Sequence, residues 1–342
     1  MKNIIICTCL LIFLPFEMYS QSGDSSRYFY LKGSEAQSGR LYLQAYQNYK
    51  RSLEFDPKNP DPLRQLGITE VELRKYEEAI PVFEKLKSVV PADTTAIVQL
   101  GKLYFYMHQW EKDIPFEVKA IQMHIGEKNY YIIGKSYYEL EDYGHAFSYL
   151  PSAAMEEPKN AEIPYMIAHA YVDMNNYKPA IPYFQKAIAL DSSKAQWIYE
   201  CALVYATVYK DDSAVLYYDL ASSKGYKKDN DFYENLADSY ISIGKPEKAL
   251  QILQDLLLKK PADLELLNSL GSINYKLKKY DSAIEYWDRI LGYDKQNAHA
   301  LYMIGMSYQK KGDIEKGKAL CDKAIAIDPS LKNLKKEIRT EQ

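Results

Sequence analysis

The side chains that most often perform catalysis or bind metals are sparse and dispersed in this sequence. It contains no His-Glu-x-x-His, no Gly-x-Ser-x-Gly, no phosphate-binding glycine loop and no Cys-x-x-Cys. A metal site needs several side chains that converge at bonding distance. The histidines are instead spread over separate stretches of the chain. We therefore expect no enzyme activity, no cofactor and no metal. The five histidines are His108, His124, His145, His169 and His299.

Tyrosine is the abundant side chain with functional potential, at 33 of 342 residues. It offers a large, rigid aromatic surface with a polar tip, and it loses little entropy when it is immobilised. That chemistry suits recognition of a partner. Whether these tyrosines bind or pack depends on the elements that carry them.

Residues 161–194 show what those elements are. They read as two short amphipathic helices joined by a turn at residues 174–176. Apolar residues recur at helical spacing and form one stripe on each helix. A single hairpin cannot bury such a stripe alone, so neighbouring hairpins must cover it. The stripes contain Ile167, Ala168 and Tyr171 on the first helix, and Ala180, Phe184 and Ala187 on the second.

Small residues repeat along the whole chain at intervals of 33 to 35 residues. A second small column follows twelve residues after the first, and only Asp113 interrupts it. Agreement between two columns over most of the chain indicates an array of equal units. The first column is Gly33, Gly67, Gly101, Gly134, Ala168, Ala202, Ala237, Gly271 and Gly305.

This pattern resembles the tetratricopeptide repeat (TPR) family, whose unit is a 34-residue helix–turn–helix. The resemblance covers residues 26–331. It implies an all-α, right-handed superhelical solenoid of about nine TPR helix-turn-helix units. It also implies that the first helices line a concave groove for a protein partner.

The third unit, residues 94–126, departs from its neighbours. It places Asp113 and Glu117 where the preceding unit has Ala79 and Phe83, and it is one residue short. Charged residues on a buried stripe oppose packing. We therefore expect the second helix of this unit to be irregular or tilted.

The resemblance also implies which residues face the groove. These positions precede the small column by three and six, and follow it by one, four and five. We expect an aromatic, mildly basic middle, followed by an acidic stretch containing Asp231, Glu234, Asp238 and Glu265. The alternative is that the tyrosines pack against neighbouring first helices. The candidate partner-binding residues are Lys102, Phe105, Tyr131, Lys135, Tyr138, Tyr165, His169 and Tyr199.

The N-terminal residues 1–22 have the layout of a secretory signal peptide. Lys2 precedes an apolar run at residues 4–14, and Pro15 ends it. The run is shorter than the approximately 20 residues that a membrane span needs. We expect cleavage after Ser20 or Ser22, the alternative being an uncleaved anchor. Cleavage would leave no stable membrane span.

The expected mature chain retains two cysteines, Cys201 and Cys321, which fall on buried stripes far apart in the array. We expect both to be buried and unpaired. The chain also lacks an Asn-x-Ser/Thr glycosylation site. These features favour the bacterial periplasm over a eukaryotic secretory route.

Residues 332–342 alternate apolar and basic side chains at helical spacing. Because the ends of a repeat array need a polar outer face, we expect a C-terminal capping helix. A basic contact patch is the alternative. The formal net charge of −3 argues against a nucleic-acid partner.

Together these features predict an exported, periplasmic scaffold that mediates protein–protein interaction through its concave groove, with a protein or peptide partner of unknown identity. Two alternatives remain open. The first is a cell-wall or polysaccharide binder, and the second is an accessory subunit of an envelope enzyme complex.

Overall fold

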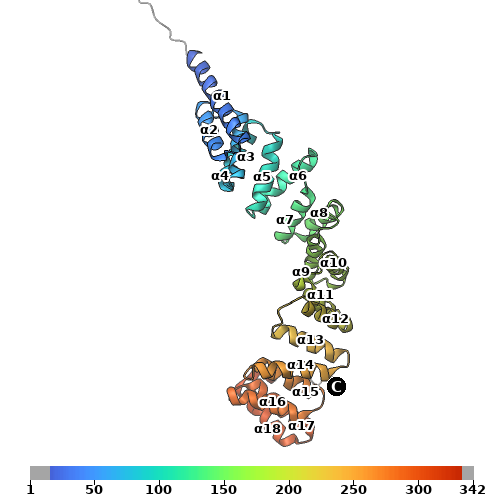
Figure 1. Cartoon of the computed structure of the whole chain (residues 1–342). Helices are drawn as coiled ribbons and strands as arrows, with labels where there is room; N and C mark the ends of the chain where they lie inside the picture. Colours follow the sequence, from blue (N-terminus) through green and yellow to red (C-terminus); the bar gives the residue numbers. More distant parts are fainter. Residues whose placement is uncertain (1–15, 333–342) are drawn as a thin grey trace, which may run out of the picture. The chain divides into compact units, whose positions relative to one another are not determined.

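The computed structural model describes residues 16–332 of the chain, with side chains from residue 23 (Figure 1). Within this range the chain forms α-helices, one short 3₁₀ helix and no strand, in agreement with the expected all-α solenoid of TPR-like hairpins. The chain divides into two compact units, Met1–Met166 and Ile167–Gln342. The boundary falls within α9 (Glu162–Asp173).

The helices of each unit follow one another as consecutive hairpins. In every hairpin the first helix has an odd number and the second an even number. The first unit contains α1 (Phe16–Ser38), α2 (Tyr42–Phe55), α3 (Pro60–Glu72), α4 (Tyr76–Val89), α5 (Thr94–Tyr106), α6 (Trp110–Gln122), α7 (Asn129–Glu139) and α8 (Tyr143–Glu156). The second unit contains α10 (Tyr177–Leu190), α11 (Ala195–Thr207), α12 (Asp211–Ser223), α13 (Asn230–Ser242), α14 (Pro246–Lys259), α15 (Leu264–Lys276), α16 (Tyr280–Tyr293), α17 (Ala298–Lys311), α18 (Ile314–Ile327) and the 3₁₀ helix η1 (Pro329–Lys332).

The small column lets a large side chain of the second helix rest on the backbone of the first. A Cβ atom added to Gly67 would lie 2.6 Å from the Phe83 ring, and one added to Gly134 would lie 2.7 Å from Leu150. The large residue follows the small one by sixteen positions. This partner column is buried throughout, and consists of Tyr49, Phe83, Glu117, Leu150, Phe184, Tyr218, Leu253, Trp287 and Cys321.

The turn inside each hairpin has one shared geometry. The residue seven positions after the small residue has a positive φ, and the next residue donates its backbone N–H to a carbonyl five residues back, as Gln109 does to Tyr104 at 2.9 Å. This is a Schellman closure of the first helix. The positive-φ residues are Arg40, Arg74, His108, Glu141, Asn175, Tyr209, Gly244, Lys278 and Gly312.

Aromatic pairs join the two helices of several hairpins. The rings of Tyr104 and Phe116 lie 5.7 Å apart, those of Tyr171 and Tyr183 5.9 Å apart, and those of Tyr205 and Tyr217 5.1 Å apart. Each pair is separated by twelve residues. Part of the tyrosine excess therefore stabilises individual hairpins.

The third hairpin corrects the first of the two alternatives expected there, an irregular helix. α6 is a continuous helix of 13 residues, not an irregular one, even though Asp113 and Glu117 are both buried inside it. Gly101 on α5 has no Cβ, and this absence makes room for the Glu117 carboxylate. The acidic pair therefore takes the places of Ala79 and Phe83 without interrupting the helix.

The expected terminal segments fall largely outside the described residues. Residues 1–15 of the expected signal peptide and residues 333–342 of the expected capping helix are not described, and α1 begins at Phe16. At the C-terminal end, Leu331 of η1 is buried against Leu301 and Tyr302. Cys201 and Cys321 are buried, and neither forms a disulfide within the described residues, as expected. Within residues 16–332, no helix has both the length and the apolar character to cross a membrane.

Candidate functional site

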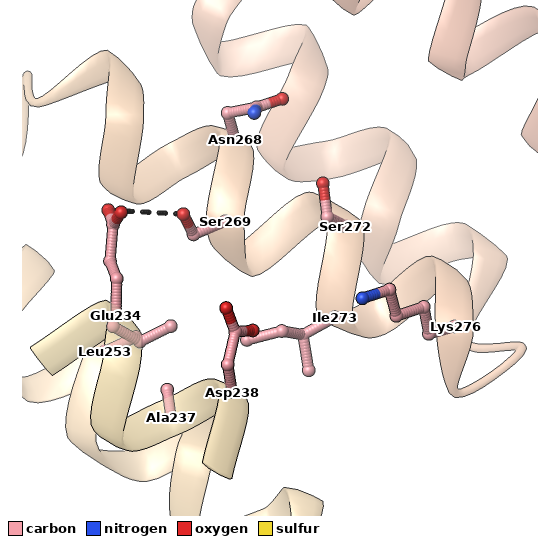
Figure 2. Close-up of a pocket in the computed structure, with 9 residues that line it drawn as sticks. All are labelled: Glu234, Ala237, Asp238, Leu253, Asn268, Ser269, Ser272, Ile273 and Lys276. Atoms are coloured by element: carbon pink, nitrogen blue, oxygen red, sulfur yellow. Dashed lines mark hydrogen bonds between the residues drawn. The ribbon is translucent and has the colours of Figure 1, made fainter. Parts of the chain in front are cut away.

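A polar pocket of about 220 Å³ lies between two first helices of the second unit, α13 and α15 (Figure 2). Its floor is apolar and comes from Ala237, Leu253 and Ile273. Its walls are polar, and they consist of Glu234 and Asp238 on α13, and Asn268, Ser269, Ser272 and Lys276 on α15. We refer to this feature as the α13–α15 pocket.

Two carboxylates give the α13–α15 pocket its character. The Ser269 hydroxyl donates a hydrogen bond of 3.2 Å to Glu234 (Figure 2). Loss of solvation raises the pKa of Glu234 above its usual range, and so do the charges of Glu265 and Asp231. Asp238 as a whole residue is exposed, but its carboxylate faces the pocket. Loss of solvation raises the pKa of this carboxyl group, and the positive charge of Lys276 lowers it. A further positive charge in the pocket would therefore stabilise the ionised form of both acids.

Within the described part of the chain, no salt bridge neutralises these acids. Among the residues that the structure describes, Asp231, Glu234, Asp238 and Glu265 form no salt bridge within 4.0 Å. Lys276 contributes one positive charge to the lining. The balance is negative, so the pocket can accept a cationic group.

A second pocket, of about 160 Å³, lies two hairpins earlier in the same unit, between α9 and α11. It occupies the equivalent place in the repeat: His169 corresponds to Asp238, Phe184 to Leu253, and Thr207 to Lys276. His169 Nδ1 lies 3.1 Å from Asp173 Oδ2. One oxygen of Glu200, Oε2, is buried without a hydrogen-bond partner. The α9–α11 pocket is lined by His169, Val172, Tyr177, Phe184, Glu200, Leu203, Val204 and Thr207.

In the first unit, two of the candidate residues meet at a single carboxylate. The Tyr131 hydroxyl donates to Glu162 Oε2 at 2.7 Å, and the Lys135 ammonium donates to Glu162 Oε1 at 2.6 Å. Burial and the Glu162 charge both raise the pKa of Tyr131. Lys128 pairs with Glu157 in the same way, at 2.7 Å. Lys128 and Lys135 of the expected basic middle are thus neutralised by ion pairs that join neighbouring repeats, whereas Lys102 forms none among the described residues.

The remaining candidates of the first unit lie on first helices and are at least partly exposed. Lys102 is exposed on α5. Phe105 packs edge-on against Trp110, with ring centroids 5.3 Å apart. The Tyr138 ring lies 6.0 Å from that of Tyr143. Tyr165 is half-buried on α9.

Tyr199 differs from the other candidates because it is only 7% exposed. Its ring stacks on Tyr226 at 4.3 Å and also contacts Tyr218 and Phe232. Tyr302, at the same position of the repeat, is fully buried. At these two positions the structure favours the packing interpretation of the tyrosines.

Several lining residues were absent from the sequence-based candidates. Counted from Gly271, the inward-facing positions already name Asn268, Ser272 and Lys276, so the repeat register could have found them. Glu162 carried no such signal, because its role depends on contact between repeats. Among the described residues, no group of three or more His, Cys, Asp or Glu side chains is arranged so that it could hold a metal ion.

Comparison with known proteins decides the family. Models of the tetratricopeptide repeat match residues 161–194, 234–291 and 298–331. These matches coincide with hairpins of the array, including both hairpins that form the α13–α15 pocket. The chain belongs to the tetratricopeptide repeat family. TPR arrays act as protein–protein interaction scaffolds and are generally non-enzymatic, and the repeats of this chain support a scaffold for protein–protein interaction.

Individual TPR relatives are similar over short stretches only. The chain is 37% identical over 76 residues to FK506-binding protein 5 of Rhizopus delemar, which spans 20% of each protein. It is 25% identical over 75 residues to tetratricopeptide repeat protein 1 of Schizosaccharomyces pombe, covering 22% of this chain and 7% of the relative. The chain thus matches a small part of the length of both relatives.

One solved structure resembles the TPR chain over most of its length. It is that of Naa15/Naa10 bound to HypK-THB, with a TM-score of 0.50, 13% identity, and coverage of 92% of this chain and 60% of that one. At this identity the likeness concerns the fold alone.

Proposed function

We propose that this TPR scaffold is exported to the periplasm, performs no catalysis, and holds an extended segment of a partner protein on its first helices. In the second unit, a lysine or arginine of that segment enters the α13–α15 pocket. The observation that carries the proposal is the pair Glu234 and Asp238, which face a cavity of about 220 Å³ and lack an internal ion pair among the described residues.

The pocket suits a long basic side chain for two reasons. Its apolar floor, formed by Ala237, Leu253 and Ile273, can cover the aliphatic stem. Its carboxylates can then receive the charged end in a partly desolvated setting, where charge-assisted hydrogen bonds are stronger. Ser272 and Asn268 add polar groups that can bind the backbone of an extended segment.

A peptide selection tests this specificity directly. A random peptide library displayed on phage is selected against the purified mature chain, and in parallel against Glu234→Gln/Asp238→Asn. We expect wild-type binders to be enriched in lysine and arginine, and this enrichment to disappear with the double variant. Asp255→Asn, an exposed acid on the second helix α14, serves as the matched control and should keep the enrichment. Equal composition of binders from all three proteins would contradict the proposal.

The alternative partners give different results in a companion assay. A selected basic peptide should be displaced by a second basic peptide but not by soluble cell-wall glycans. Displacement by glycans would favour a polysaccharide binder. Capture of an envelope enzyme whose activity depends on this chain would favour an accessory subunit instead.

Export rests on the N-terminal sequence alone and has its own test. The apolar run at residues 4–14 supports removal of a signal peptide. Intact mass of the native protein should correspond to a chain that begins at Gln21 or Gly23. A soluble cytosolic protein that retains Met1 would contradict periplasmic export while leaving the binding proposal intact.

A further inference from the structure

The strongest departure from the repeat pattern is a buried pair of acids in the first unit. Asp113 is fully buried and Glu117 is 3% exposed, and both lie on α6 one helical turn apart. Charged residues are almost never fully buried unless they are paired. Neither acid forms a salt bridge within the described part of the chain. This arrangement is costly in the ionised state, so it calls for a physical role.

The immediate surroundings of the pair are only partly polar. From α7, the Ser136 hydroxyl donates to Asp113 Oδ2 at 2.8 Å. The other oxygen, Oδ1, is buried without a hydrogen-bond partner. From α5, Gly101 leaves space for the Glu117 carboxylate, and the exposed Lys102 is the one cation that acts on it. Within α6 the two acids repel one another.

The equivalent positions in other hairpins hold apolar side chains, which α6 lacks. In α16 the same positions hold Ala283 and Trp287, both fully buried, and Gly271 supports the Trp287 ring. An alanine and a large apolar residue pack equally well at any pH. Two carboxyl groups pack well only while they are neutral, because burial disfavours the charged form.

We propose that Asp113 and Glu117 form a pH-sensitive switch, which holds α6 against α5 and α7 under acidic conditions and loosens it as the pH rises. The inference stands on the burial of the pair, the Oδ1 atom without a hydrogen-bond partner, and the absence of a salt bridge to either acid within the described residues. It does not depend on the proposed function. If the first helices do hold a partner, the switch acts on the hairpin that carries Lys102 and Phe105.

The direction of the effect follows from proton linkage. Burial raises the pKa of each carboxyl to about 7, from ordinary values of 3.8 for Asp113 and 4.5 for Glu117. Between the ordinary and the raised values, the closed hairpin binds more protons than the opened one. Its stability therefore falls as the pH rises from about 4 to about 7, and changes little above that.

Hydrogen exchange followed by mass spectrometry on the mature chain can localise this effect. Protection factors, corrected for the intrinsic pH dependence of exchange, are measured at about pH 5 and about pH 8. We expect the protection of α6 to fall at least tenfold, because a tenfold change corresponds to a single unit of coupled pKa shift. The matched helix α16 should change far less over the same range.

Three variants make the test decisive. Asp113→Asn/Glu117→Gln keeps the shape but cannot titrate, and should remove the pH dependence of α6. Asp113→Ala/Glu117→Phe introduces the residues that the second hairpin has at these positions, Ala79 and Phe83, and should protect α6 at both pH values. Glu70→Gln removes another buried acid, on α3, whose pKa burial also raises to about 7, and should leave the α6 response in place. An α6 that responds like α16, or that still responds in the Asn/Gln variant, would overturn the proposal.

Discussion

Gly271 lies directly under the indole ring of Trp287: a Cβ atom at this glycine would come within 2.6 Å of the ring carbon Cε2. The indole N–H also donates to Asn268 at 3.0 Å, so the ring cannot turn away without losing that bond. Asn268 in turn lines the α13–α15 pocket. The packing of the eighth hairpin and the shape of the pocket therefore depend on one glycine.

Replacing this glycine should destabilise the eighth hairpin. We expect Gly271→Ala to cost about 1–3 kcal/mol, because the methyl group overpacks a rigid ring. The control is Gly292→Ala on α16, where an added Cβ meets nothing within 4 Å. There the alanine should stabilise the helix by about 0.5–1 kcal/mol. Urea unfolding monitored by circular dichroism measures both, and equal effects of the two substitutions would contradict the assigned packing.

The repeat register predicted most of the fold because it depends on contacts within a hairpin. The spacing between Ala168 and Ala180 defines two helices and a turn without any knowledge of neighbouring repeats. The TPR family then supplies the way in which hairpins stack. The structure agrees with these predictions from α2 onward, and α1 begins about ten residues earlier than the array expected from residue 26.

The candidate site was harder to predict because it depends on contacts between repeats. Tyr131 and Tyr199 share a repeat position, yet one bonds Glu162 and the other is enclosed by Tyr226. Tyr226 lies in the six-residue connection between α12 and α13, which is longer than the four-residue connection between α10 and α11. The repeat register placed Asp113 on a buried stripe, but the continuity of α6 around it escaped prediction, because the room for Glu117 comes from Gly101 on the neighbouring helix.

The hairpin turns offer a stabilising substitution. Tyr209 has a φ of 59°, a left-handed conformation that costs a non-glycine residue about 1–2 kcal/mol. It is also 91% exposed, so its side chain contributes little packing. We expect Tyr209→Gly to raise stability by a fraction of that strain, up to about 1 kcal/mol. Thermal unfolding measures the gain, and Tyr209→Ala, which keeps a Cβ atom, should show none of it.

Glu162 connects the fourth and fifth repeats through its ion pair with Lys135 and its hydrogen bond with Tyr131, and we expect this connection to contribute little to the free energy of unfolding. Removing the charge by Glu162→Gln should cost at most about 1 kcal/mol, because its side chain is 39% exposed and solvent screens the pair with Lys135. The cost should shrink at high salt. Denaturant unfolding at two ionic strengths checks both points. Glu111→Gln, an exposed acid outside the ion pairs of the described chain, should be neutral at both.

Tyr199 distinguishes packing from binding most sharply among the candidate residues. Its ring contacts Tyr218, Tyr226 and Phe232 and is almost excluded from solvent, so Tyr199→Ala should cost about 3–5 kcal/mol through the cavity that it leaves. Tyr293→Ala serves as the control, because that side chain is 59% exposed on α16 and should change stability by less than about 0.5 kcal/mol. Thermal unfolding and binding of a selected peptide are measured on the same variants. A small loss of stability together with a large loss of binding would place Tyr199 in the recognition surface. The expected result is the reverse, namely a large loss of stability, with binding reduced only in proportion to the fraction of unfolded protein.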